Sequence, residues 1–217
     1  MSTVETETYK GHEIEIKYDQ NPENCRTDWD NMTEIHCCSS RYYLGEHNHS
    51  SWEECDVAIS EARKRGDLVF KVFAYIHSGT VLSLESFYGH LPQGHAEFDS
   101  GQSGYMVVKK KDIIENWGKK NWTKELRKKA YEVALSDIKT FNSYLNGEVY
   151  GYIVDDDGED SCYGYYDTED ALQEARAVID WIIKEKIKEK IKEHCEKLKK
   201  NIKGKVPLQY RTSLEIS

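Results

Sequence analysis

The chain has 217 residues, of which 32% are charged and 38% hydrophobic, and its 15 Tyr, 5 Trp and 5 Phe can fill a core. This composition argues against a largely disordered protein. No window approaches the roughly 18 consecutive apolar residues of a membrane span, and the N-terminal MSTVETETYK lacks the basic-then-apolar order of a signal peptide. We therefore expect a cytoplasmic protein with no membrane contact.

The net charge of −9 conceals four blocks of alternating sign. Residues 1–108 carry 18 acids against 8 bases, 109–147 carry 5 against 10, 148–180 carry 11 against 1, and 181–217 carry 5 against 11. Blocks of opposite sign favour a protein partner with complementary patches over a uniform polyanion such as duplex DNA. We expect a protein with a basic surface as partner, and direct nucleic-acid binding is disfavoured.

Short strands and one helix are predicted in the first half of the chain. YKGHEIEIKYD and MTEIHCC have the composition and alternation of strands. SSWEECDVAISEARKRGD predicts a helix with a serine cap, acidic residues in its first turn and Gly66 at its end. The inward face of this helix is expected to hold Trp52, Cys55, Ile59 and Ala62.

The next elements are predicted to be a hairpin, a strand and two helices. LVFKVFAYIHSGTVLSLESF contains two strand-like runs around an HSG turn, and SGYMVV is a further strand. KKDIIENWG predicts a short helix ended by Gly118, and a longer helix extends from about Thr123 to Asn146. GEVYGYIVDDDGEDSCYGYY then predicts a hairpin with a tight turn at DDDG.

A helix of some 36 residues is expected from Asp167 or Thr168 to about Lys203. From Ile183 to Cys195 its apolar stripe narrows to one residue in four, which is too thin to be covered by a globular core. We expect Ile187, Ile191 and Leu198 to mediate partner docking or formation of a homo-oligomer. The predicted fold is α+β, with a mostly antiparallel sheet, packed helices and a long C-terminal helix, divided into a core domain (1–180) and a helical extension with tail (181–217).

The loop NPENCRTDWDN at residues 21–31 concentrates turn formers, an arginine, two aspartates and a tryptophan between two predicted strands. One interpretation is structural, with Arg26 paired to Asp28 or Asp30 and Trp29 inserted in the core. The other is a binding site, in which the two aspartates offer paired carboxylates to a cation or a basic partner. The residues of that candidate site are Asn24, Arg26, Asp28, Trp29, Asp30, Asn31 and Arg41.

NPENCRTDWDNM, RYYLGE, AYIHSGTVLSL, FDSGQSGYMVV and GEVYGYIVDDDGEDSCYGYY occur in an order that resembles a family of hypothetical proteins found largely in phages and other mobile elements. The likeness covers roughly residues 10–170. It implies a mobile-element origin and no particular activity. Two places depart from the pattern: Cys25 stands where proline is expected, which relaxes the loop, and EIHCCSS is less typical.

Strand ends form a second group of candidates, which contains His77, Ser78, Asp99 and Ser100. A Ser-His-Asp hydrolase would use such residues, but no Gly-x-Ser-x-Gly nucleophile elbow is present. Turn formation explains the same residues, with Asp99-Ser100-Gly101 as an Asx-type turn.

Metal ligation is also conceivable, because His36, Cys37, Cys38, His47 and His49 lie within fourteen positions. Adjacent cysteines in a strand point to opposite faces, so Cys37 and Cys38 cannot both reach one ion. DDDGED lacks the downstream glutamate of a calcium loop. We therefore expect neither a metal nor a cofactor, and the six scattered cysteines are predicted to be thiols.

Two functional hypotheses follow. The leading one is a phage or mobile-element binding protein that docks on a host protein, with antagonism of host defence of the anti-restriction or anti-CRISPR type as its specific form. The alternative is a small-ligand or nucleotide binder, or a hydrolase, that uses the loop of residues 24–31 together with His77 and Asp99. The alternative requires Asp28, Asp30, His77 and Asp99 to converge in one pocket.

Overall fold

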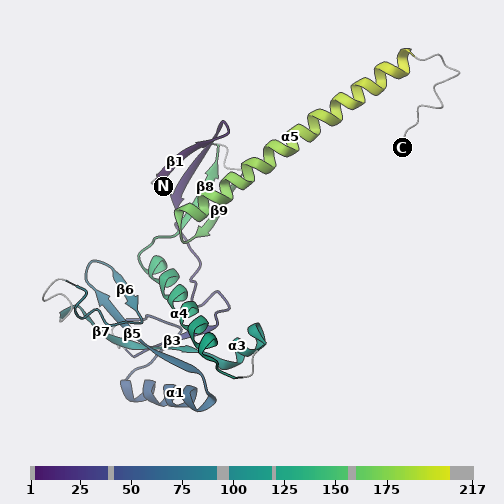
Figure 1. The fold of residues 1–217 in the computed structure, drawn as a ribbon. Coiled ribbons are helices and arrows are strands. Elements are labelled where there is room, and N and C mark those ends of the chain that lie inside the picture. Colours follow the sequence, from purple (N-terminus) through teal and green to yellow (C-terminus); the bar gives the residue numbers. More distant parts are fainter. Residues whose placement is uncertain (1–2, 39–41, 92–97, 119–120, 156–159, 206–217) are drawn as a thin grey trace. The chain divides into compact units, whose positions relative to one another are not determined.

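The computed structural model describes residues 3–38, 42–91, 98–118, 121–155 and 160–205. Its fold is α+β, with two sheets and a long C-terminal helix, as the sequence predicts (Figure 1). Among these residues no helix is long and apolar enough to cross a membrane.

The described chain divides into two compact units, whereas we expected one core domain over residues 1–180. Unit 1 contains the described parts of residues 1–17, 151–162 and the chain from 168 onward. Unit 2 contains residues 18–150 and 163–167. Unit 2 is therefore inserted between two neighbouring strands of the unit 1 sheet.

Unit 1 consists of a four-stranded sheet in the order β1-β2-β8-β9 and the helix α5. Its elements are β1 (Thr3–Tyr9), β2 (His12–Tyr18), β8 (Tyr150–Val154), β9 (Asp160–Tyr165) and α5 (Thr168–Lys205). The turn between β1 and β2 uses positive φ angles at Lys10 (49°) and Gly11 (87°), the conformation of a tight hairpin turn. The predicted DDDG turn falls at residues 155–158, of which 156–158 lie outside the described part of the chain.

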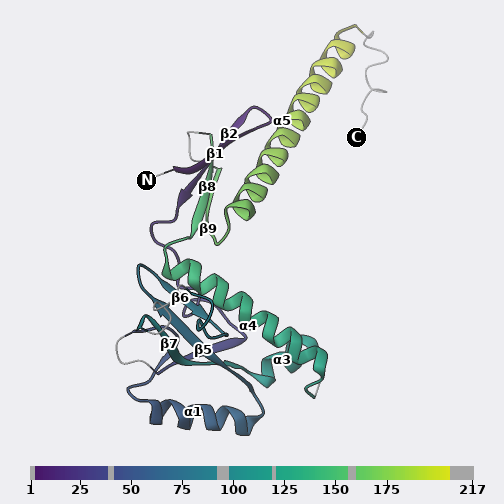
Figure 2. The same ribbon diagram turned by 60° about the vertical axis from the view of Figure 1, so that its left-hand side comes forward.

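The buried apolar residues of unit 1 come from β2, β8 and the first part of α5. Ile14 and Ile16 alternate on β2, as predicted, and are fully buried. On α5, the buried residues recur at helical spacing, in the first part of the helix, which runs beside the unit 1 sheet (Figure 2). They are Ala171, Leu172, Ala175 and Ile179.

Unit 2 has a five-stranded sheet in the order β4-β3-β7-β5-β6, with helices on both faces (Figure 1). Its strands are β3 (Thr33–Cys37), β4 (His47–Asn48), β5 (Leu68–Ile76), β6 (Thr80–Ser83) and β7 (Ser100–Val108). The strand pairs β3–β7, β5–β6 and β5–β7 are antiparallel, and β3–β4 is parallel. The helices are α1 (Trp52–Arg65), α3 (Lys110–Trp117) and α4 (Lys124–Leu145).

Helix boundaries in unit 2 follow the predicted caps. Ser51 accepts a hydrogen bond from the Glu54 amide at the start of α1, and Gly66 ends that helix with a φ of 85°. Thr123 accepts from the Leu126 amide at the start of α4. On α1, Cys55, Ile59 and Ala62 are buried as expected, but Trp52 is 40% exposed and packs edge-on against Tyr105.

Two apolar layers lie on opposite faces of the unit 2 sheet. The larger contains Ile35 and Cys37 of β3 with α3 and α4, and the smaller contains Cys38, Val107 and the inward face of α1. Cys37 and Cys38 thus face opposite sides, as the strand periodicity requires. The prediction of thiols is wrong for Cys38 and Cys55, because the structure joins them in a disulfide. Cys25, Cys37 and Cys195 are thiols.

Candidate functional site

Arg26, a candidate binding residue of the 21–31 loop, is buried, with 3% of its surface exposed. Its guanidinium donates to the Thr33 carbonyl oxygen at 2.8 Å and lies against the carboxylates of Glu46 and Asp137. Glu46 also accepts a hydrogen bond from the Ile35 amide at 2.9 Å. Arg26 therefore anchors the loop to β3 and α4 rather than pairing with Asp28 or Asp30.

Three further residues of the loop hold its own backbone. Asn24 Oδ1 accepts from the Arg26 amide, and Asp28 Oδ2 accepts from the Asn24 amide, both at 2.9 Å. Asn31 Nδ2 donates to the Cys25 carbonyl oxygen at 2.8 Å. These contacts explain why turn formers concentrate here.

Trp29 and Asp30 are exposed residues of the same loop. Trp29 is 42% exposed and packs edge-on against Tyr166, with 5.4 Å between the ring centroids, so it does not fill the core. Arg41, the remaining loop-associated candidate, lies outside the described residues.

His77 and Asp99 meet at one end of the unit 2 sheet. His77 Nδ1 lies 3.0 Å from Asp99 Oδ2, and the neighbouring Ser78 is exposed. Asp99 and Ser100 also line a cavity of about 310 Å³ together with Leu44 and Ile76. The structure thus brings His77 and Asp99 into contact at this edge, and a binding role for them stays a prediction.

The 24–31 loop does not join this pair. The loop leads into Thr33, which is paired with Val108 at the last residue of β7, whereas Asp99 immediately precedes the first residue of the same strand. At about 3.3 Å per residue, the length of β7 separates the two groups by tens of ångströms. The convergence that the ligand-binding or hydrolase hypothesis requires is absent for Asp28, Asp30, His77 and Asp99.

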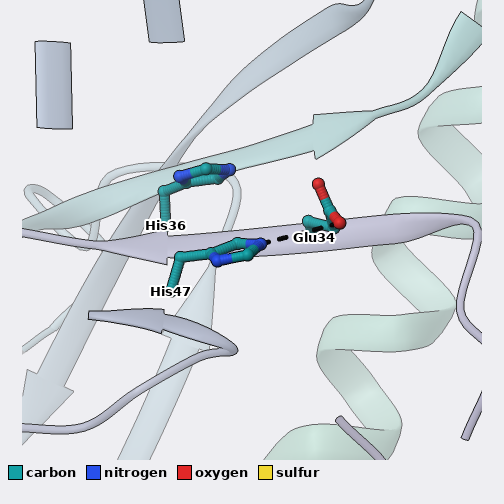
Figure 3. Close-up of side chains that lie close together, drawn as sticks. All are labelled: Glu34, His36 and His47. Atoms are coloured by element: carbon teal, nitrogen blue, oxygen red, sulfur yellow. Dashed lines mark ion pairs between the residues drawn. The ribbon is translucent and has the colours of Figure 1, made fainter. Parts of the chain in front are cut away.

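Glu34, His36 and His47 form a cluster at the β3–β4 edge of the unit 2 sheet (Figure 3), and His49 contacts His36. Alternation along β3 places Glu34 and His36 on the same side as Cys38, which packs with α1. Glu34 and His36 are two residues apart on β3 and so project from one face, and His47 of β4 is the register partner of His36. One potential ligand atom from each of Glu34, His36 and His47 lies within 4.8 Å of the others.

The imidazoles of the cluster are in direct contact. The His36 and His47 rings stack with 4.5 Å between centroids, and His36 Nδ1 lies 3.0 Å from His49 Nε2. Burial, reinforced by His47 and His49, lowers the pKa of His36 to about 4. His36 is therefore a neutral imidazole at neutral pH.

Glu34 stays ionised in this cluster. Burial by itself would raise the pKa of Glu34, but the hydrogen bond and charge of Lys109 outweigh burial and lower it. Lys109 Nζ lies 2.7 Å from Glu34 Oε1, and His47 Nε2 lies 3.6 Å from the same oxygen.

Two glycines permit the close packing around β3. A Cβ at Gly104 would collide with the carbonyl oxygen of His36, and one at Gly45 would collide with Ile35. Sequence reasoning considered His36 and His47 but not Glu34. The signal was available as Glu-x-His and His-x-His, since alternate residues of a strand share a face.

The C-terminal part of α5 shows the exposed stripe that the sequence predicts. Ile187 is 53% exposed, Ile191 58% and Leu198 46%. Every residue from 186 to 201 is exposed, so we define residues 182–201 as the distal helix.

Comparisons with protein-family models, curated proteins and solved structures gave no match.

Proposed function

We propose that this protein acts by docking on another protein, and that the distal helix provides the contact. The observation that carries the proposal is the row of half-exposed Ile187, Ile191 and Leu198 on a stretch of helix, residues 186–201, in which every residue is exposed. A row of three large apolar side chains is a typical anchor for a helix that lies in a partner's groove.

The charge of the distal helix favours an acidic partner over a second copy of the chain. Residues 182–201 contain eight lysines and four glutamates, which gives a net charge of +4. Two of the lysines pair within the helix, Lys188 with Glu185 and Lys197 with Glu193. Two such helices side by side would repel each other, whereas an acidic groove would attract the surplus lysines.

This proposal changes the expected charge of the partner. The expectation of a basic partner rested on the acidic blocks at residues 1–108 and 148–180, but the exposed stripe lies in the basic block at 181–217. The phage-protein resemblance favours a host protein as the partner. A restriction or CRISPR component is the specific class to test first.

The ligand-binding or hydrolase alternative keeps candidate residues at only one end of the unit 2 sheet. Without the 24–31 loop, it depends on the His77–Asp99 pair beside the cavity of about 310 Å³. A carboxylate–imidazole pair can orient a general base, but an exposed pair also serves as an ordinary turn contact. We therefore rank docking ahead of this alternative.

The test is capture of partners from host-cell lysate by the full chain, followed by zero-length carbodiimide cross-linking, which joins lysines to carboxylates. The disrupting variant is Ile187→Glu with Ile191→Glu. The matched control is Val57→Glu with Leu135→Glu, which makes the same chemical change at apolar residues that are 62% and 42% exposed on α1 and α4.

The proposal predicts a partner whose capture is lost in the Ile187→Glu/Ile191→Glu variant, retained in the control and weakened by salt. Cross-links must join distal-helix lysines to acidic residues of that partner. Capture that survives the Ile187→Glu/Ile191→Glu substitutions overturns the proposal. Sedimentation that shows a dimer of the wild type and a monomer of this variant also overturns it, in favour of self-association.

A further inference from the structure

We propose that Glu34, His36 and His47 form a binding site for a divalent transition-metal ion of the zinc class. The proposal concerns unit 2 and is independent of the docking role of α5. Its basis is the convergence of two imidazoles and one carboxylate, with one potential ligand atom from each residue within 4.8 Å of the others (Figure 3).

Strand geometry directs the three side chains to one point. Glu34 and His36 alternate on β3, and the parallel pairing of β3 with β4 places His47 beside His36. β3 is held between β4 and β7, and Gly45 and Gly104 pack so closely against it that an added Cβ would collide with Ile35 or His36. The donors are thus carried by the sheet rather than by a free loop, which favours a site with defined geometry.

The donor set suits zinc and related ions. Two histidines and one glutamate are the protein ligands of a common class of zinc site that keeps a further position for water or another ligand. The same donors also hold other first-row divalent ions, whereas calcium and magnesium prefer sites built wholly of oxygen.

Neighbouring groups prepare the donors for an ion. His49 contacts Nδ1 of His36, which leaves Nε2 of His36 for the metal, and such a contact fixes the ring orientation. The Glu34 carboxylate supplies the negative charge.

Nearby cations oppose metal binding. Lys109 already pairs with Glu34, and Arg65 contributes positive charge near His36. An ion at the site must therefore displace the Lys109 ammonium or take the other oxygen of Glu34. Replacement of Lys109 by methionine should strengthen metal binding, an effect that a purely structural cluster would not show.

The experiment is titration of the full chain with Zn²⁺ by calorimetry and with Co²⁺ by visible absorption. The key variant is His47→Gln. The His47 side chain is 44% exposed, so removal of the imidazole should leave folding intact. Circular dichroism and the urea midpoint of the metal-free variant check this. The control is His194→Gln with Cys195→Ser, which removes an exposed donor pair on α5.

We expect one high-affinity Zn²⁺ per chain, weakened about tenfold or more by His47→Gln and unchanged in the α5 control. The Co²⁺ complex should show d–d bands without the charge-transfer absorption of a cobalt–thiolate bond. Absence of a stoichiometric site overturns the proposal. So does an affinity that survives His47→Gln, or a site that disappears with His194→Gln and Cys195→Ser.

Discussion

The two halves of α5 carry the same kind of apolar residue in opposite environments. Ala171, Leu172, Ala175 and Ile179 are 0–3% exposed, whereas Ile187, Ile191 and Leu198 are 46–58% exposed. The proximal stripe is widened by the adjacent pair Ala171–Leu172, and the distal stripe has one residue per turn. The width of an apolar stripe therefore separates a helix segment that builds a core from one left for a partner.

The largest expected difference between the halves is in the cost of truncating one isoleucine. Ile179→Ala should lower the free energy of unfolding by about 2–5 kcal/mol, because it leaves a cavity in the unit 1 core. Ile187→Ala should change it by no more than about 0.5 kcal/mol, since that side chain is half exposed. Urea unfolding of both variants tests the contrast, which equal losses would contradict.

A smaller difference is expected from the ion pairs of the two halves. In the proximal half, Arg176 Nε and Nη2 donate to Glu7 of β1 at 2.9 and 2.6 Å, a contact between elements far apart in sequence. Arg176→Met should lower the free energy of unfolding by much less than Ile179→Ala does, because solvent screens a partly exposed pair. Urea unfolding at neutral pH provides the measurement.

The same pair gives a pH dependence of known sign. The Arg176 hydrogen bond lowers the pKa of Glu7 below 4.5, with burial opposing it. The pair therefore contributes stability above pH 4.5, and this contribution is lost as the pH falls through the lowered pKa. The stability difference between wild type and Arg176→Met should shrink below that pH, and a constant difference would contradict the assignment.

The smallest effect is expected from the intrahelical pair of the distal helix. Glu185→Gln removes the partner of Lys188 and should cost no more than about 0.5 kcal/mol. A loss as large as that of Ile179→Ala, measured under the same conditions, would mean that the distal helix is part of the folded core.

Local sequence signals predicted those elements whose causes are local. Ser51, Gly66 and Thr123 mark helix ends by capping, and the alternation at Ile14 and Ile16 identifies a half-buried strand. The narrow stripe after Ile183 predicted exposure of the distal helix. Each of these depends on residues a few positions apart.

Long-range pairing explains what sequence reasoning missed. TVETETY of β1 lacks an apolar alternation because the strand lies at a sheet edge and is largely exposed. β2 pairs with β1 on one side and with β8, more than 100 residues later, on the other, so the insertion of unit 2 leaves no local signal. For this reason the sequence predicts one core domain where the structure has unit 1 and unit 2.

The candidate sites show the same limit. Arg26 is conspicuous in the loop, but its partners Glu46 and Asp137 are 20 and 111 residues away, so its structural role was hidden. His77 and Asp99 were paired correctly because both follow from one hairpin and its neighbouring strand. Glu34 was missed as a neighbour of His47 because the parallel β3–β4 contact was not predicted.

The most direct test of the docking role compares two truncated chains. One ends at Glu185 and lacks the exposed stripe, and the control ends at Lys205 and retains the full length of α5. The account predicts the same urea midpoint for unit 1 in both, with capture of the cross-linked partner lost only in the shorter chain. A shorter chain that still captures the partner would contradict the assignment of docking to the distal helix. Strong destabilisation of the shorter chain would show that the distal helix is part of the unit 1 core.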